Sequence, residues 1–309
     1  MSDLEVRELR YFVAVAEELH FGRAAERLGM AQPPLSRAIG RLERRLEVSL
    51  FRRTTREVSL TPAGESLLAD ARIALDAVAA AERRTRNLGR PTPSLRVAFK
   101  ADFDAGLLPA ILEAFEREPA ARPVELIMGG RGDQVRALRT GTADVAILPT
   151  PFDENGLDWE PLLTEPRLLA VAATDPLAGR GELRLADLAG RVLPDGWPAD
   201  RGDQPVTGTT PPPSTVPGLS GPLDLAQIFN LVALGRVVWF VPRSIVQRSP
   251  RPDIAYRVVA DLPPTTLTVS WPRVTRDQAV AAFVRTAAEV AAAAHDPAAP
   301  TGLSRRGRA

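Results

Sequence analysis

A short run of prolines, arginines and leucines, GMAQPPLSRAIGRLERRL at residues 29–46, combines residue types that could contact a polyanion. On a helical wheel, Arg37, Arg41 and Arg44 fall on one side. The opposite side carries apolar residues at spacings of four, three and four, namely Leu35, Ile39, Leu42 and Leu46. A helix with this division packs one face into a domain and presents a row of guanidinium groups on the other. Such a row fits the major groove of DNA, where arginine pairs with guanine and with phosphates.

Two prolines, Pro33 and Pro34, stand in the first turn of this predicted helix, which extends from Gln32 to Glu47. A proline costs little there, because the first N–H groups of a helix have no partner within it. We therefore expect the prolines to fix the start of the helix and to allow a close approach to a phosphate backbone.

Basic charge is concentrated around this segment. Between Leu19 and Arg56 there are nine arginines and three glutamates, although the formal net charge of the whole chain is only +1. Local basic charge is the footprint of a polyanion-binding surface. The chain has 38 arginines and a single lysine, Lys100, so a general arginine bias with a solvated surface is the alternative explanation of the charge alone.

The residues that enzymes use are scarce in this chain. It contains no cysteine, which excludes disulfides and thiol chemistry. Its two histidines, His20 and His295, are too isolated for a triad or a metal cluster. No GxSxG, P-loop or GxGxxG motif is present, and the pair Asp102 and Asp104 on one loop is a weak acid–base signal. We expect no enzymatic activity, no metal and no cofactor.

The bulk composition is that of an ordinary globular protein, with 45% hydrophobic and 25% charged residues. The length of 309 residues fits about two domains. No apolar run approaches the roughly 18 residues that span a bilayer, and the segment MSDLEVRELR lacks the pattern of a signal peptide. We therefore expect a cytoplasmic protein without a membrane partner.

Helical periodicity dominates the first ninety residues. Helices are predicted at 4–19, 23–29 and 32–47, which is a helix-turn-helix pattern, followed by a hairpin at 49–62 with Arg53 to Arg56 at its tip. A long helix is predicted at 62–88, and its alternating four- and three-residue spacing predicts a dimerisation seam. The seam consists of Leu67, Ala71, Ala74, Val78, Ala81, Thr85 and Leu88. An amphipathic helix that lies on its own domain is the alternative.

From Leu95 onward, predicted strands and helices alternate. Strands are expected at 94–99, 123–128 and 143–149, with helices at 106–118 and 133–141 between them. A second round contains 168–173, 185–190, 224–235, 236–242 and 266–271, and a final helix at 275–294 completes it. This alternation predicts a parallel, doubly wound sheet. The proline-rich segment 198–222 is expected to be a long loop, and residues 295–309 a disordered tail.

The sequence of residues 9–64, LRYFVAVAEELHFGRAAERLGMAQPPLSRAIGRLERRLEVSLFRRTTREVSLTPAG, closely resembles the amino-terminal domain of LysR-type transcriptional regulators. The ordered signals are AAxxL, QPxLSRxI, LExxL, LFxR and LTxAG. Two positions depart from the family pattern, since Ala31 replaces a capping Ser or Thr and Glu47 replaces a Gly. The AQPPLS form is similar to a branch that includes regulators of aromatic acids and related carboxylates.

The resemblance implies an α/β protein with a mostly α-helical winged helix-turn-helix at 1–61 and a linker (dimerisation) helix and hinge at 62–90. It implies a type 2 periplasmic-binding-protein-like effector domain at 91–294, in which subdomain I covers about 94–150 plus 265–294 and subdomain II about 160–264. The implied function is sequence-specific transcriptional regulation, controlled by a small molecule bound between the subdomains. Double-stranded DNA, the effector and a second copy in a homodimer are the implied partners, with a homotetramer and RNA polymerase as further candidates.

Site residues follow by matching positions to the family, with Arg41 and Arg44 added from the helical wheel as phosphate contacts. The DNA-binding set is Gln32, Pro33, Pro34, Ser36, Arg37, Arg41, Arg53 and Arg56. Arg53 and Arg56 are expected in the wing, with Arg56 entering the minor groove. The dimerisation set is Leu67, Ala71, Ala74, Val78, Ala81 and Leu88.

The expected effector site lies at strand carboxyl ends and helix amino ends, where ligands of open α/β sheets bind. The candidate residues are Lys100, Ala101, Asp102, Phe103, Gly130, Arg131, Pro149, Trp197 and Gln227. Lys100 and Arg131 would attract a carboxylated effector. The alternative for Lys100 is an ordinary solvated charge at the end of a strand, and for Trp197 it is a buried core aromatic.

Two other functions remain open from the sequence. One is a small-molecule-binding protein without a DNA function, and the other is a non-specific, nucleoid-type DNA binder. Base-specific binding that survives competitor DNA and weakens steeply with salt distinguishes a regulator from both.

Overall fold

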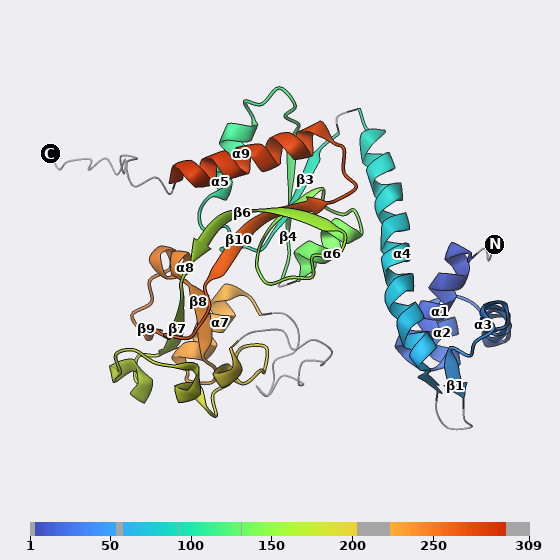
Figure 1. Ribbon diagram of the computed structural model, residues 1–309, viewed down its shortest axis with the longest axis horizontal. Coiled ribbons are helices and arrows are strands. Elements are labelled where there is room, and N and C mark those ends of the chain that lie inside the picture. Colours follow the sequence, from blue (N-terminus) through green and yellow to red (C-terminus); the bar gives the residue numbers. More distant parts are fainter. Residues whose placement is uncertain (1–3, 54–57, 92, 131, 203–222, 295–309) are drawn as a thin grey trace. The chain divides into compact units, whose positions relative to one another are not determined.

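The computed structural model describes residues 4–53, 58–91, 93–130, 132–202 and 223–294 (Figure 1). It divides into two compact units. The first comprises Met1–Gly89 together with Arg139–Gly141, and the second comprises Arg90–Leu138 and Thr142–Ala309.

The first unit contains the predicted helix-turn-helix. Its elements are α1 (Val6–Glu18), α2 (Phe21–Arg27), α3 (Gln32–Leu46), β1 (Phe51–Arg53), β2 (Val58–Leu60) and α4 (Pro62–Leu88). The two strands pair antiparallel, as the hairpin prediction requires. The core centres on Phe12, which is fully buried and whose ring centroid lies 5.5 Å from that of Phe51. The three helices, the hairpin and the long helix predicted from periodicity are therefore confirmed.

Side-chain caps define where α2 and α4 begin. The Nδ1 atom of His20 accepts hydrogen bonds from the N–H groups of Gly22 and Arg23, at 3.1 and 3.2 Å. Thr61 caps α4, since its Oγ1 accepts the N–H of Gly64 at 3.0 Å. A Cβ atom at Gly64 would lie 2.2 Å from the carbonyl oxygen of Leu50, so only glycine fits there. In the LTxAG motif, the threonine thus caps α4, and the glycine allows the backbone of α4 to lie close to the backbone of Leu50.

The end of α3 departs from the usual chemistry of a helix terminus. Glu47 follows the last helical residue with φ of 56°, in the left-handed region that favours glycine. This residue is the one that replaces the family's glycine. The backbone there is consequently strained.

The long helix α4 has two different halves. Its first half packs on its own unit, because Leu67 contacts the core and Ala71 is only 1% exposed. Ala71 is therefore covered by its own unit, Leu67 is partly covered, and their place in the dimerisation seam stays a prediction. In the second half, Ala74, Val78, Ala81 and Leu88 are exposed. Ile73, which the predicted seam omitted, is 50% exposed beside them.

The second unit begins with a five-stranded sheet in the order β4-β3-β5-β10-β6. Its strands are β3 (Leu95–Phe99), β4 (Val124–Met128), β5 (Val145–Pro149), β6 (Leu157–Glu165) and β10 (Thr265–Pro272). β3 pairs parallel with β4 and β5, but β10 pairs antiparallel with both β5 and β6. The sheet is mixed, so the prediction of an all-parallel sheet is wrong. The strand β6 was not predicted.

Helices cover both faces of this sheet. α5 (Leu108–Phe115) and α9 (Gln278–Ala294) form one core with β3, β5 and β10. The rings of Phe115 and Phe283 meet there edge to face, with centroids 5.3 Å apart. α6 (Asp133–Arg139) packs on the other face through Ala137 and Leu138. We call this sheet with its helices subdomain I.

The second sheet has the strand order β8-β7-β9, with β7 (Arg167–Ala172), β8 (Trp239–Pro242) and β9 (Ile254–Val258). Both pairings are antiparallel. α7 (Leu225–Ala233) and α8 (Arg243–Arg248) cover one face, and three short 3₁₀ helices line the other. These are η1 (Pro176–Gly179), η2 (Leu185–Leu188) and η3 (Ala199–Arg201). We call this part subdomain II.

Two chain connections join the subdomains, one between β6 and β7 and the other between β9 and β10. A two-subdomain α/β architecture is therefore confirmed, although the secondary structure of subdomain II differs from the prediction. Residues 185–190 contain a 3₁₀ helix, and β9 and α8 were not predicted. Within the described ranges, no helix has the length and apolar character needed to cross a membrane.

The strained end of α3 gives a stability prediction. Replacing Glu47→Gly removes a side chain from a left-handed position, and we expect the unfolding free energy to rise by about 1 kcal/mol. The midpoint of urea unfolding, followed by circular dichroism, measures this gain. Glu47→Ala is the control, because it removes the carboxylate but keeps the strained backbone. Equal stability of the glycine and alanine variants would contradict the explanation.

Candidate functional site

The exposed face of α3 carries the predicted DNA-contacting residues. Leu35, Ile39 and Leu42 are at most 1% exposed and form the inner face. Arg37 and Arg41 are exposed on the outer face, together with Gln32 and Pro33, while Pro34 and Ser36 are partly buried. A Cβ atom added at Gly40 would meet nothing within 4 Å. The structure thus places this part of the predicted set on one accessible surface.

The missing cap at Ala31 has a simple explanation. Ala31 is the N-cap residue of α3, and Gln32, Pro33 and Pro34 occupy its first three helical positions. A capping hydroxyl normally accepts from the second or third N–H of a helix. Both of those positions are proline here and have no N–H, so a hydroxyl at position 31 would have no donor to satisfy.

The arginines of α3 divide into paired and unpaired groups. Arg45 forms an ion pair with Glu8 of α1. Arg37, Arg41 and Arg44 make no ion pair with any residue that the structure describes. An exposed guanidinium without an internal partner keeps all its N–H donors for an external anion.

Glu43 connects α3 to the hairpin. Its carboxylate accepts the N–H groups of Leu50 and Phe51 at 2.9 and 3.2 Å, and the guanidinium of Arg53 at 2.8 Å. The Arg53 guanidinium also stacks 4.7 Å from the ring centroid of Phe21. Arg53, expected to contact DNA, is therefore held by the domain itself, and Arg56 lies outside the described residues.

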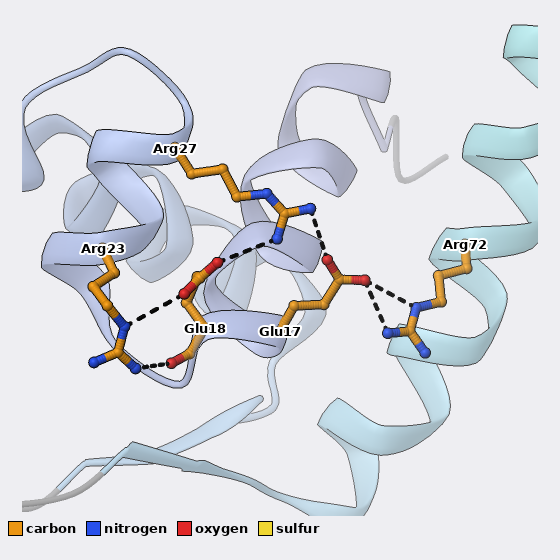
Figure 2. Close-up of polar contacts among 5 residues, drawn as sticks. All are labelled: Glu17, Glu18, Arg23, Arg27 and Arg72. Carbon is orange, nitrogen blue, oxygen red and sulfur yellow. Dashed lines mark hydrogen bonds and ion pairs between the residues drawn. The ribbon is translucent and has the colours of Figure 1, made fainter. Parts of the chain in front are cut away.

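Glu17 and Glu18 at the end of α1 join three helices (Figure 2). Glu17 accepts from Arg27 of α2 and from Arg72 of α4, each at 2.9 Å. The backbone carbonyl of Glu18 accepts from Arg23 at 2.6 Å. Burial of Glu17 works to raise the pKa of its carboxyl, but the hydrogen bonds from Arg72 and Arg27 outweigh it and lower the pKa.

This network reduces the basic charge that is free to meet a ligand. Among the nine arginines between residues 19 and 56, four pair with glutamates, namely Arg23, Arg27, Arg45 and Arg53. The local excess counted from the sequence therefore overstates the free positive charge. What remains in the described part is centred on the outer face of α3.

The predicted effector residues of subdomain I lie at one edge of the first sheet. β3, β4 and β5 run parallel, so the residues after their carboxyl ends share an edge. Lys100, Gly130 and Pro149 are brought there together, whereas Arg131 falls outside the described residues. The N–H of Gly130 is already bonded to the Asp133 carboxylate at 2.8 Å.

The loop after β3 reaches subdomain II. Phe103 packs against the core beneath α7 and α8, with its ring centroid 6.1 Å from that of Trp239. The Nζ atom of Lys100 lies 4.1 Å from the Phe103 ring centroid, which is a cation–π arrangement. Ala101 and Asp102 are exposed between them. Lys100 is thus placed by an aromatic contact and is not simply a solvated strand-end charge.

Asp104, in the same loop, forms an ion pair with Arg248 at the end of α8, with Oδ1 2.9 Å from Nη1. Burial works to raise the pKa of the Asp104 carboxyl, but the hydrogen bonds from Arg248 and from the backbone of Gly106 outweigh it and lower the pKa. This partly buried contact between the subdomains was not predicted from the sequence.

Two other predicted effector residues have local structural roles. Trp197 packs on the core between the second sheet and its 3₁₀ helices. Gln227 forms a capping box with Asp224 at the start of α7, since its Oε1 accepts the Asp224 N–H at 2.9 Å. Their assignment to the ligand site has no support in these contacts, and the core alternative for Trp197 fits them.

A separate cavity of about 430 Å³ lies where the two connections between the subdomains pass. Its lining includes Pro166 and Arg167 from one connection, Leu262 and Pro264 from the other, and Arg243 of α8. None of the predicted effector residues lines it.

Within the described ranges, no group of three acidic or histidine residues is arranged to hold a metal ion.

Sequence reasoning missed the structural roles of His20, Glu43 and Arg248. His20 caps α2 through Nδ1, but histidine is not among the residues preferred at an N-cap, so no sequence signal marked this role. Glu43 and Arg248 act through contacts 7 to 10 and 144 to 146 residues away. The spacing of residues along a short stretch of sequence does not predict contacts of this kind.

Two family models match the chain. The model described as "Bacterial regulatory helix-turn-helix protein, lysR family" matches residues 6–65. The model described as "LysR substrate binding domain" matches residues 88–195. The first match contains α1 to α3, and the second contains the loop after β3.

Curated relatives agree with these matches. The transcriptional regulator AlsR of Bacillus subtilis (strain 168) is 35% identical over 200 residues, or 63% of this chain and 66% of AlsR. The chain thus matches slightly less than two thirds of AlsR. A probable hydrogen peroxide-inducible genes activator of Mycobacterium xenopi is 36% identical over 173 residues, which cover 56% of this chain and 92% of that protein.

A solved structure is similar over almost the whole chain. Full-length CbnR in complex with its target DNA has a TM-score of 0.52 and 27% sequence identity, covering 93% of this chain and 100% of CbnR. AlsR is named a transcriptional regulator, as are several other relatives of similar identity. Together with the two matched families, they show that this chain belongs to the LysR family of transcriptional regulators.

Proposed function

We propose that this protein is a sequence-specific DNA-binding transcriptional regulator whose helix α3 reads the major groove and whose α/β unit binds a small-molecule effector. The observation that carries the proposal is the outer face of α3, where Arg37, Arg41 and Arg44 have no described ion-pair partner. The protein acts in the cytoplasm, with DNA as its partner and without an enzymatic reaction.

The DNA-binding part of the proposal rests on geometry and charge. An exposed helix of this kind fits the major groove, and arginine can read guanine bidentately there. Because Pro33 and Pro34 have no N–H, Gln32 supplies the N–H group at the start of the helix, where binding of a phosphate is favoured. The similarity to CbnR, which was solved with its target DNA, supports this mode of binding.

The second half of α4 supports a dimer. Ile73, Val78 and Leu88 are 50%, 38% and 58% exposed, and exposed alanines lie between them. A band of exposed apolar residues on a helix marks an interaction surface. If two chains pair through this band, their two α3 helices can contact two half-sites of one DNA site. We further propose that the protein forms a tetramer and that RNA polymerase is an additional partner.

The effector is proposed to bind at the shared edge of β3, β4 and β5, next to subdomain II. A carboxylate or an aromatic acid suits this edge, because Lys100 supplies a cation and Phe103 an aromatic face. A ligand that prefers one angle between the subdomains would shift that angle, and with it the spacing of the DNA-binding heads.

A non-specific DNA binder is the second candidate function. It would use the same guanidinium groups but only against phosphates. The two candidates differ in the response of binding to base sequence, which the first of the following experiments measures.

Replacing Arg37→Ala should weaken binding to a DNA site selected from a random pool by roughly 10- to 100-fold, because a bidentate base contact is lost. Gel-shift titration with and without competitor DNA measures the change. Arg45→Ala is the matched control on the same helix, since Arg45 is already paired with Glu8. An equal loss in both variants, or binding by the wild type that ignores base sequence, would contradict the proposal.

Arg41 is assigned to a phosphate, so Arg41→Ala should weaken binding to all sequences to a similar extent. We expect the slope of log affinity against log salt to become shallower by about 1. Fluorescence anisotropy across a salt series gives this slope. A change in base preference with an unaltered slope would show that Arg41 reads a base.

The dimer band is tested by Ile73→Asp and Val78→Asp, each of which places a charge in the exposed apolar stripe. We expect monomers in analytical ultracentrifugation and the loss of specific DNA binding, with unchanged unfolding of the α/β unit. Arg86→Asp is the control, because Arg86 lies on another side of the same helix and pairs with Glu82. A dimer that persists in both aspartate variants would remove this interface from the proposal.

A further inference from the structure

The loop that follows β3 is held in an unusual shape. Asp102 and Ala105 have φ angles of 67° and 53°, and Gly106 has 78°. Only the glycine adopts this region without strain. A loop with two strained non-glycine residues opens unless surrounding contacts hold it in place, so its partners are informative.

Arg248 supplies those contacts from the other subdomain. Its Nη1 donates to Asp104 Oδ1 at 2.9 Å, and its Nη2 donates to the carbonyl oxygen of Asp102 at 2.5 Å. A Cβ atom at Gly106 would lie 3.5 Å from the Arg248 side chain, so the guanidinium lies directly against the turn. One side chain thus donates hydrogen bonds to the loop at two points, Asp102 and Asp104, and lies close to a third, Gly106.

Asp104 is the centre of the loop and is only 8% exposed. Its carboxylate also accepts the N–H of Leu108 at 3.3 Å, at the start of α5, and its carbonyl accepts the N–H of Leu107 at 2.9 Å. Removing Arg248 would leave a buried carboxylate without its cation, which favours opening of the loop.

The helix that carries Arg248 is fastened at its other end as well. Ser244 donates from its N–H and its Oγ to the carboxylate of Glu165, at 2.6 and 2.8 Å. The N–H of Arg243 donates to the carbonyl of Pro166 at 3.1 Å. Glu165 is the last residue of β6, where the chain leaves subdomain I. α8 is therefore attached both to the loop and to a connection between the subdomains.

We infer that Arg248 is a positioning residue that clamps the loop Lys100–Gly106 of subdomain I onto α8 of subdomain II. The clamp keeps Lys100 and Phe103 together and sets the separation of the subdomains in the absence of ligand. The inference rests on the proposed function only in naming this loop as part of the effector site. An effector that rearranges the loop must work against the clamp, and α8 passes the change to β6.

The absence of cysteine makes the clamp measurable in the full-length chain. Glu116→Cys and Ala186→Cys place two spin labels at exposed positions of subdomains I and II. Electron–electron double resonance, with labelled protein diluted into unlabelled protein, gives their distance distribution within one chain. We expect Arg248→Ala to broaden this distribution toward longer distances, and Arg248→Lys to restore it only partly.

Hydrogen exchange of residues 100–108 gives a second readout, because the amides of Leu107 and Leu108 are bonded to Asp104. Loss of the clamp should speed their exchange at least about tenfold while the helices of the first unit exchange as before. Asp104→Asn removes the charge and replaces one acceptor oxygen with an NH₂ donor, so it should reproduce the effect. If the two residues act as one pair, the double variant should add little to either single variant.

Arg251→Ala is the matched control. Arg251 is exposed to a similar degree, but it pairs with Asp253 inside subdomain II, at 2.7 Å. Distances and exchange rates that are unchanged in both Arg248→Ala and Asp104→Asn would overturn the clamp, as would equal changes in Arg251→Ala. Neither measurement involves DNA, so failure of the clamp and failure of the proposed function are separate results.

Discussion

The burial of Leu35, Ile39 and Leu42 against the aromatic core of the first unit is the constraint on which the proposed DNA-binding surface depends. It sets the rotation of α3 about its own axis and so determines that Arg37 and Arg41 remain in water. The ion pairs of Arg27, Arg45 and Arg72 add to the division, because they use part of the other positive charge to join helices. One apolar contact surface therefore defines what the opposite face can bind.

The same reasoning separates the two halves of α4. Its first half is part of the core around Phe12, and its second half has exposed apolar residues such as Ile73 and Leu88. Under the proposed function, the first half of α4 belongs to the core of the first unit and the second half supplies the surface for a second copy. The network of Glu17 with Arg27 and Arg72 fastens α4 to α1 and α2. Motion of α4 would consequently move the whole helix-turn-helix.

Local patterns predicted the first unit well, and long-range pairing limited the prediction of the second. The helix predicted at 62–88 has the same ends in the structure, because Thr61 and Pro62 are local signals for a helix start and Gly89 is one for a helix end. The antiparallel pairing of β10 depends on chain that returns from more than a hundred residues away, which spacing cannot reveal. Gln227 and Trp197 looked like ligand residues by position, but a cap and a core contact account for them. Arg53 has the right residue type for DNA, yet its environment holds it against Glu43.

Glu43 has a consequence for how such a protein can change over generations. One carboxylate fastens α3 to the start of β1 through two backbone N–H groups and Arg53. Under the proposed function, these contacts make α3 and the hairpin one DNA-binding unit, which is expected to stay intact as the sequence evolves. New operator preferences would then evolve by exchange of exposed side chains such as Arg37, and Glu43 would be retained by selection even where the operators of two lineages no longer resemble each other.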